Sequence, residues 1–259
     1  MSGQHATLGH LMSKSPVSPF VRRGAADGCT IGCLAIVLLA VTVAGVAFVW
    51  EGIWGEDRTK QHRHPNGGGW VDQGARVHED AYVDRNARVR DAARVGKGAR
   101  IEDGAEVSGR ANVVGDVTVR ERACVTGDAR VEAPWGSIRI GGNAIVSENA
   151  EIRTGMFSEI QVIERAQVAG NAKVSGSVRI DGAAIVRGKS QVSGLAHIGE
   201  RALVEGESRI SGKAGVFGDA HIDGSAQVSG VVEVFGTARV TGRANVSEGV
   251  IRDGTLGVP

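Results

Sequence analysis

The sequence predicts an all-β fold, a parallel β-helix in which three short strands make each coil. Three observations in its 259 residues predict this fold. From Val71 onward, Val or Ile recurs at six-residue steps, at 29 positions that end at Val246 and are offset only by two insertions. A small residue, most often Ala, lies four positions after each regular position, and Gly followed by Asn or Asp often supplies turn chemistry. The period near 3.6 that a helix requires is absent.

Each six-residue unit reads as one strand and one tight corner. Ala172 and Val174 are two positions apart, so in a strand both side chains point to one side, toward a core, and the residues between them point outward. Outward serines recur every 18 residues, which makes three hexads per coil: Ser175, Ser193, Ser211, Ser229 and Ser247. The pattern therefore predicts a left-handed parallel β-helix of nearly ten coils, about 45 Å long at about 4.7 Å per strand.

Two insertions interrupt the array, and we expect the β-helix to continue through both. They add three residues within 132–139 and four within 153–161. Counting hexads around the coil places both at the corner between the second and third faces, in consecutive coils. The two loops should therefore be neighbours, and the residues that they bring together are Pro134, Trp135, Met156 and Phe157.

Composition excludes several classes of protein. Lys and Arg number 30 and Asp and Glu 29, so the net charge is +1, and we expect no nucleic-acid partner because a basic footprint is absent. Aromatic residues make up 4%, so the core is aliphatic. The three cysteines, Cys29, Cys33 and Cys124, cannot form a disulfide framework. Cys124 is expected to point outward and has no histidine beside it in the sequence to activate it as a nucleophile.

The N-terminal part predicts a single-pass membrane anchor. Residues 28–50 carry no charge, and as a helix they would span about 34 Å, enough for the roughly 30 Å hydrocarbon core of a bilayer. A cleaved signal peptide is the competing interpretation, but a leader of 27 residues and a long apolar run argue against it. Arg22 and Arg23 precede the segment and Glu51 follows it, which favours an extracytoplasmic C-terminal domain.

The rest of the chain divides into four parts. Residues 1–27 are polar and small, which predicts a disordered tail. A flexible linker is expected over 51–69. The β-helix is expected over 70–252, followed by a C-terminal tail over 253–259.

The repeat also resembles a known family. Units such as 170–174, and the opening at 68–71, are similar to those of the hexapeptide-repeat, left-handed β-helix superfamily, over Val71 to about Arg252. The chain looks most like poorly characterised bacterial and phage-borne proteins with A-x-V-x-G-x repeats, some named acetyltransferases by analogy. The resemblance implies two chemistries: acyl transfer, by a histidine base near a projecting loop in a trimer, and zinc-dependent carbonic anhydration.

The sites for those chemistries are poor in this sequence. The array holds three histidines, His78, His197 and His221, and lacks the H-x4-H pair of the zinc enzymes, so we expect no metal and no cofactor. His62 and His64 in the linker read as solvated side chains. His197 is the catalytic candidate if the chain is an acyltransferase, because it lies beside the corner that carries the loops, two coils beyond them. No second polar group is expected to converge on it, so a solvated strand histidine is the favoured interpretation.

A line of apolar residues predicts a contact surface. Six outward residues flank the corner between the third and first faces in successive coils: Ile145, Ile163, Ile185, Leu203, Phe217 and Phe235. A contiguous line of surface hydrophobes marks a contact site, so we expect a homotrimer or a protein partner.

Two functions are consistent with these features. The first is a non-catalytic, membrane-anchored rod that presents its β-helix for self-association, including end-to-end stacking, or for a partner. The second is a membrane-tethered acyltransferase with a loop-lined groove. The poor sites favour the first function, and the anchor makes the lipid bilayer an expected partner in either case.

We expect residues 28–50 to be retained as a transmembrane helix. After carbonate extraction of membranes from cells that express the full chain, the full-length protein should stay in the pellet, because alkaline extraction does not release a spanning helix. A mature protein that begins at Phe48 would show instead that the segment is a cleaved signal peptide.

Overall fold

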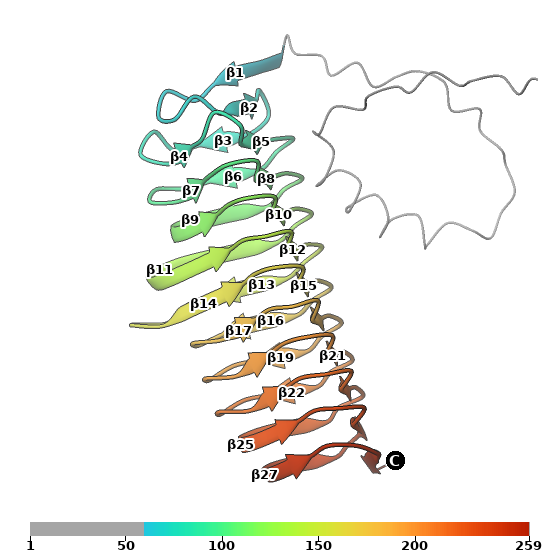
Figure 1. The fold of residues 1–259 in the computed structure, drawn as a ribbon. Coiled ribbons are helices and arrows are strands. Elements are labelled where there is room, and N and C mark those ends of the chain that lie inside the picture. The colour runs from blue at the N-terminus through green and yellow to red at the C-terminus, as the bar shows by residue number, and fades with distance from the viewer. Residues whose placement is uncertain (1–59, 259) are drawn as a thin grey trace, which may run out of the picture.

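Short parallel strands stack into a rod, one coil upon the next (Figure 1). The computed structural model describes residues 60–258. About ten coils follow one another, and the named strands pair in parallel throughout, except for the first strand. The parallel β-helix predicted from the hexads is confirmed. The chain folds as a parallel β-helix with six residues per strand and corner.

Each coil has three faces. The first face is a 12-stranded sheet made of β1 (Gln61–Arg63), β2 (Trp70–Asp72), β5 (Arg88–Val89), β8 (Glu106–Val107), β10 (Cys124–Val125), β12 (Ile145–Val146), β15 (Gln167–Val168), β18 (Ile185–Val186), β21 (Leu203–Val204), β24 (His221–Ile222), β26 (Arg239–Gly242) and β28 (Thr255–Val258). The second face carries β3 (Arg76–Val77), β6 (Arg94–Val95), β13 (Glu151–Arg153), β16 (Lys173–Ser175), β19 (Gln191–Val192) and β22 (Arg209–Ile210). The third face carries β4 (Tyr82–Val83), β7 (Arg100–Ile101), β14 (Glu159–Val162), β17 (Arg179–Ile180), β20 (His197–Ile198) and β23 (Gly215–Val216).

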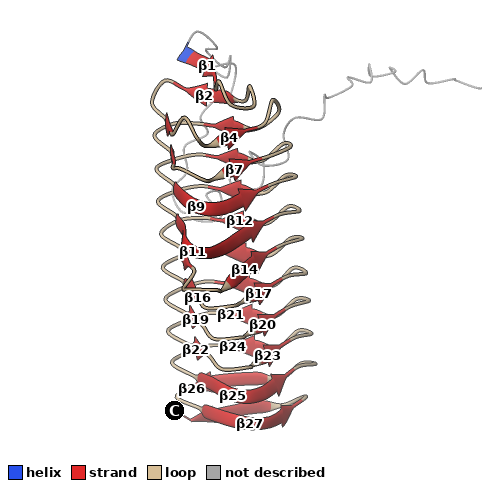
Figure 2. Cartoon of the chain, turned by 90° about the vertical axis from the view of Figure 1, so that its left-hand side faces the viewer, coloured by secondary structure: helices blue, strands red, loops and turns tan. Residues whose placement is uncertain are grey.

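Four longer strands bend around the corner between the second and third faces (Figure 2). They are β9 (Asn112–Val119), β11 (Arg130–Ile140), β25 (Gln227–Val234) and β27 (Asn245–Ile251). Because these strands are continuous, the second and third faces form one 16-stranded sheet.

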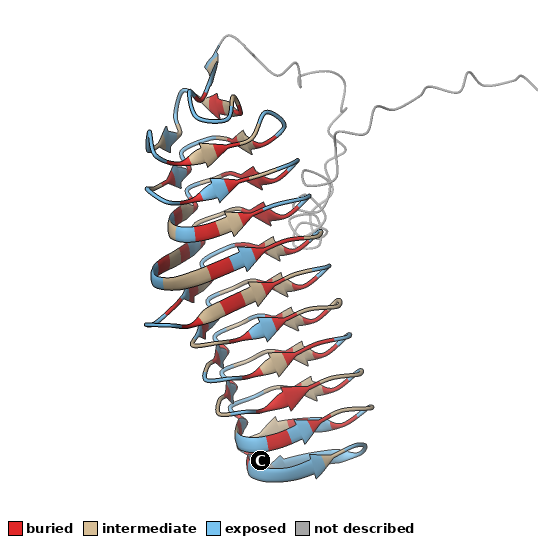
Figure 3. Ribbon diagram, turned by 60° about the vertical axis from the view of Figure 1, so that its left-hand side comes forward, coloured by how far each residue is buried: buried red, intermediate tan, exposed pale blue. Residues whose placement is uncertain are grey.

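The core is a column of aliphatic side chains enclosed by the three faces. Buried residues recur from coil to coil along the rod (Figure 3). Of the 29 Val and Ile positions that the repeat predicts to point inward, 28 are buried, and Val77 in the first coil packs partly exposed against them. Burial of each such side chain stabilises the fold by about 1.5–3 kcal/mol. A narrow core without aromatic rings is therefore enough to hold the coils together.

Corner residues in the left-handed backbone region turn the chain from one face to the next. At most corners the residue two positions after the inward Val or Ile has a positive φ, and it is usually Gly. A Cβ at Gly182 would lie 2.6 Å from the backbone N of Glu200 in the next coil, so the stacking excludes a side chain there. Glu200 itself has a φ of 59°, and its carboxylate accepts a hydrogen bond from the backbone N–H of Gly218, one coil further on.

The folded domain begins earlier than the sequence predicted. Strand β1 lies within the expected linker 51–69 and pairs antiparallel with β2. His64, expected to be solvated, is 4% exposed. The loop that follows β1 packs against the first coil. Asn66 Nδ2 donates a 3.0 Å hydrogen bond to the backbone O of Ala81, and a Cβ at Gly69 would lie 2.3 Å from a methyl carbon of Val83. This hairpin and loop cap the N-terminal end of the core, a role that the hydrophobic repeat does not reveal.

The C-terminal end also differs from the expected tail at 253–259. Strand β28 pairs in parallel with β26 and begins another coil on the first face. Within residues 60–258 no helix is long and apolar enough to cross a membrane. The predicted tail 1–27 and the predicted transmembrane segment 28–50 lie outside the described residues.

Two buried serines occupy the inward position that is elsewhere most often Ala. Ser208 Oγ donates a 2.8 Å hydrogen bond to the backbone O of Glu205, whereas Ser190 Oγ, also fully buried, has no hydrogen-bond partner in the described part of the chain. We expect Ser190→Ala to raise the free energy of unfolding by about 1–3 kcal/mol, because it removes an unpaired buried hydroxyl.

The matched control is Ser208→Ala, which removes a satisfied hydroxyl and should not stabilise the protein. Urea unfolding of both variants beside the parent measures the difference. Equal shifts in the two variants would contradict the hydrogen-bonding assignment.

Candidate functional site

Both insertions lie at the corner between the second and third faces, in adjacent coils. Strand β11 runs through the first insertion, and its pairing with β9 shifts register between Ala133 and Ile138. The second insertion separates β13 from β14, and both of these strands pair with β11. The loops touch at Gly136, where a Cβ would clash with the backbone O of Ser158. The β-helix is therefore continuous, with two loops side by side on one edge.

The tips of these loops are apolar and exposed. Trp135 is 71% exposed, Met156 69% and Phe157 94%, and Pro134 beside them is exposed as well. Phe157 has a φ of 56°, a left-handed conformation that costs a non-glycine residue on the order of 1 kcal/mol or more. Ser158 Oγ closes the turn with a 2.7 Å hydrogen bond to the backbone O of Gly155. The turn thus holds a strained aromatic residue out in solvent. We call Pro134, Trp135, Met156 and Phe157 the loop corner.

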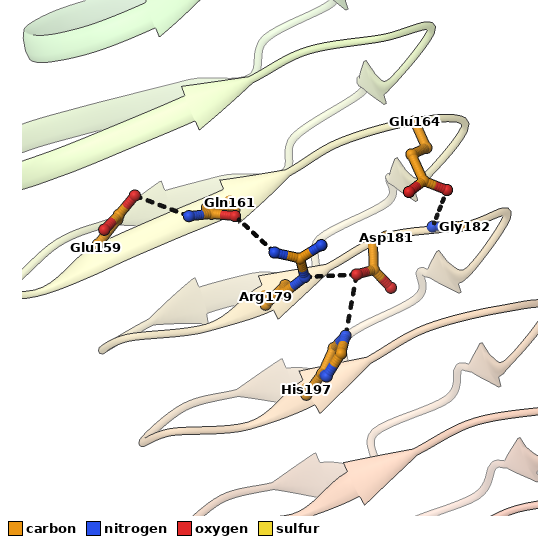
Figure 4. A network of polar contacts seen from close by, with 7 residues as sticks. All are labelled: Glu159, Gln161, Glu164, Arg179, Asp181, Gly182 and His197. Carbon is orange, nitrogen blue, oxygen red and sulfur yellow. Dashed lines mark hydrogen bonds and ion pairs between the residues drawn. The ribbon is translucent and has the colours of Figure 1, made fainter.

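His197 lies in a chain of polar contacts on the third face (Figure 4). Its Nε2 is 3.0 Å from Asp181 Oδ2, and the Arg179 guanidinium binds the same carboxylate oxygen. Arg179 also donates to Gln161 Oε1 at 3.1 Å, and Gln161 donates to Glu159 at 2.8 Å. The chain of contacts therefore connects His197 with β14, the strand that follows the second loop.

Phe217 packs against the histidine from the other side. The two rings are perpendicular, with centroids 4.8 Å apart. Two glycines make room for this arrangement: a Cβ at Gly215 would lie 2.6 Å from the Phe217 ring, and one at Gly199 would lie 2.6 Å from Asp181 Oδ1. The ring of Phe217 is therefore partly covered by its own chain.

The expectation that no second polar group converges on His197 was wrong. Asp181 lies 16 residues earlier, so it falls one coil back and diagonally across the ladder rather than directly beside the histidine. When the imidazole donates a hydrogen bond from Nε2–H to the carboxylate, the lone pair of Nδ1 is left to accept a proton from a substrate. The Asp181 carboxylate is shared with Arg179, however, so it stabilises a developing imidazolium less than an unshared carboxylate would.

The other array histidines have carboxylate partners too. His221 Nε2 is 2.9 Å from Glu205 Oε1, the same 16-residue diagonal, and His78 Nδ1 is 3.8 Å from Asp80. Burial alone would raise the pKa of Glu205, but hydrogen bonds from Arg187 and His221 outweigh it and lower that pKa. His78 Nδ1 accepts a hydrogen bond from the backbone N–H of Asp80, so its contact with that carboxylate is of another kind. Since His221 makes the same 16-residue contact as His197, the pairing of His197 reflects the ladder geometry of this fold and is weak evidence for catalysis.

Candidate metal ligands are scattered over the described residues. No group of three or more His, Cys, Asp or Glu side chains there is arranged to hold a metal ion. Cys124, expected to point outward, is 1% exposed in β10.

The six residues of the predicted contact surface are all half-buried. Three of them lie in strands of the first face and three directly follow strands of the third face, and Ile185 lies directly beside Leu203 in the ladder. Phe217 contacts His197, and the Arg252 guanidinium lies over the ring of Phe235, 4.7 Å from its centroid. The two aromatic members thus have partners within the chain, unlike the side chains of the loop corner.

No protein-family model matches the chain, and no curated protein matches it. Among solved structures, it is similar to the UDP-N-acetylglucosamine acyltransferase of Francisella novicida, with 16% identical residues and a TM-score of 0.23. The match covers 60% of this chain and 63% of that chain, which is less than two thirds of the acyltransferase. A likeness at this level carries no argument about activity.

We expect His197→Ala to leave any activity of the full chain toward acyl-CoA at the level of the parent. The reason is that Arg179 shares the carboxylate that would support the histidine as a base. Release of free thiol from acyl-CoA measures the activity, and His221→Ala, which breaks an equivalent diagonal pair, is the control. Thiol release that is lost in the His197 variant and kept in the control would show that His197 is catalytic.

Proposed function

We propose that this protein is a membrane-anchored, non-catalytic interaction rod that associates with a second copy of itself through the loop corner. In this proposal residues 28–50 are the anchor, and the β-helix is a stiff support that holds the loop corner at a fixed place along its edge. The observation that carries the proposal is the exposure of three large apolar side chains, Trp135, Met156 and Phe157, on adjacent loops.

Such a cluster is unusual on the surface of this molecule. The other large exposed hydrophobic residues of the described chain are aliphatic, and they are Val114, Leu195, Val231, Val250 and Leu256. Isolated surface hydrophobes need no explanation, whereas neighbouring ones that protrude together indicate a contact site. The left-handed φ of Phe157 supports this interpretation, because strained residues cluster where a chain has a function to perform.

The charge balance favours a second copy as the occupant. The net charge is +1, with 30 basic and 29 acidic residues, so two copies meet without strong repulsion. Many outward charges are already paired along the rod, as in Arg201 with Asp219 at 2.6 Å. An anchor in the bilayer would also confine both copies to one plane and raise their effective concentration.

The test compares two double variants of the full chain in mild detergent. We expect Trp135→Ser with Phe157→Ser to shift the sedimenting species from oligomer to monomer, because it removes most of the apolar area of the loop corner. The matched control is Leu195→Ser with Val231→Ser, which removes two exposed apolar residues elsewhere and should leave the oligomer intact. Thermal unfolding shows that each variant retains the β-helix.

Two outcomes would overturn the proposal. If the parent chain is monomeric at every concentration, self-association fails. If Phe217→Asp with Phe235→Asp dissociates the oligomer and the loop variant does not, then the contact is the line of half-buried residues from Ile145 to Phe235, as the sequence predicted for a trimer.

A second candidate function is a membrane-tethered acyltransferase. The observation that favours it is the hydrogen bond between His197 and Asp181, which positions the imidazole of a half-exposed histidine. A base alone does not make an acyltransferase, and the thiol-release comparison of the His197 and His221 variants separates this candidate from the first.

A further inference from the structure

A groove of about 520 Å³ is lined by residues of β3 and β6 and their neighbours. These two strands belong to the second face and lie near the N-terminal end of the rod (Figure 1). The groove shares no residue with the loop corner. Arg76 and Arg94 line its side, and they are direct neighbours in the parallel ladder, about 4.8 Å apart along the rod. The volume is within the range of about 300–1,000 Å³ that is usual for small-molecule sites.

The two arginines lack carboxylate partners. Both are exposed, and within residues 60–258 neither guanidinium makes a hydrogen bond or an ion pair. Like charges at adjacent ladder positions repel, so an unpaired stack destabilises the fold slightly. Asp80, an acidic residue near this end of the second face, is engaged with Lys97 at 3.3 Å and with His78 at 3.8 Å.

Several outward arginines elsewhere in the rod bind a carboxylate in the next coil. Arg110 binds Asp128 through two hydrogen bonds of 2.6 Å, and Arg201 binds Asp219 in the same way, each pair being 18 residues apart. The Arg110 guanidinium hydrogen-bonds the carboxyl of Asp128 and lowers its pKa. Arg76 and Arg94 instead lie directly beside each other in the ladder, and neither binds a carboxylate within residues 60–258.

The floor of the groove is apolar. Val77, an inward residue of the first coil, is only partly buried, and Val114 is 39% exposed. Gly96 lies between them without a side chain, and a Cβ there would lie 3.0 Å from a methyl carbon of Val114. Two cationic groups thus stand beside an open apolar surface.

We propose that this groove binds a phosphate monoester with an apolar substituent. The phosphate is held between the guanidinium groups of Arg76 and Arg94, and the substituent lies over Gly96 and Val114. Guanidinium groups bind phosphate oxygens through paired hydrogen bonds. A phosphate monoester carries a charge of about −1.5 to −2 at neutral pH, which matches two arginines, whereas a single carboxylate leaves one of them unpaired. His78 and Asn112 add polar groups at the rim.

The test measures binding of hexyl phosphate to the full chain in mild detergent by calorimetry. We expect binding by the parent, and weakening on the order of tenfold or more in Arg76→Gln and in Arg94→Gln, because each removes a charged pair of hydrogen bonds. The matched control is Arg209→Gln, since Arg209 occupies the same position of the hexad on the same face, in a distant coil between Gln191 and Gln227. That variant should bind like the parent.

Three further probes define the ligand. Hexanol lacks the phosphate and should not bind. Inorganic phosphate lacks the substituent and should bind more weakly than hexyl phosphate. The variant Gly96→Val should weaken the binding of hexyl phosphate and leave the binding of inorganic phosphate unchanged. Dioctanoyl phosphatidic acid in place of hexyl phosphate shows whether the source is a lipid: tighter binding that depends on both arginines assigns the groove to a lipid headgroup, and weaker binding assigns it to a soluble ester.

The proposal is overturned if the parent does not bind hexyl phosphate, or if Arg209→Gln weakens binding as much as Arg94→Gln. Stability gives a second, independent readout. Without ligand, Arg94→Gln should unfold at the same temperature as the parent or a higher one, because it relieves the repulsion with Arg76. A marked loss of thermal stability would mean that the arginine is structural and would also overturn the proposal.

Discussion

The rest of the structure depends on how closely one corner of the β-helix stacks on the next. Each corner is turned by a residue in the left-handed backbone region, and a Cβ at Gly182 would lie 2.6 Å from the next coil. Gly therefore dominates this position. Where Glu200 takes its place, the strain is offset by a charged hydrogen bond to the backbone N–H of Gly218. Close stacking at the corners in turn fixes the 18-residue coil and aligns the strands into continuous ladders.

Because the ladders repeat at every coil, the surface chemistry of this protein is arranged in rows. A side chain meets its neighbour 18 residues away directly, as in Arg187 with Glu205, or its neighbour 16 residues away diagonally, as in His221 with Glu205. Several charges are paired within such rows, as in Arg110 with Asp128 and Lys189 with Glu207. In the row that contains Arg76 and Arg94, two like charges lie side by side instead.

The same regularity determines how much could be predicted from the sequence. The inward Val and Ile positions, the three faces and the placement of both insertions follow from counting hexads. The contact of His197 with Asp181 does not, because it is a diagonal contact that depends on space left by Gly199. The N-terminal hairpin was missed for another reason: its buried residue His64 is polar and is held by backbone hydrogen bonds of the following loop, so no hydrophobic period marks it.

Insertions in this fold are confined to corners, because one extra residue within a strand would turn its inward set toward solvent. Residues added at a corner extend outward, which is why the loop corner protrudes while the core beneath it is unbroken. Outward side chains of successive coils lie side by side along a face, so they do not surround a substrate as the residues of a cleft do. The groove at the N-terminal end of the rod is open on one copy of the chain. At the loop corner, by contrast, a concave site would need a second copy to form its other wall. Any chemistry at that edge would therefore require self-association through Trp135, Met156 and Phe157 first. The second candidate function thus depends on the interaction role, whereas the interaction role does not depend on catalysis.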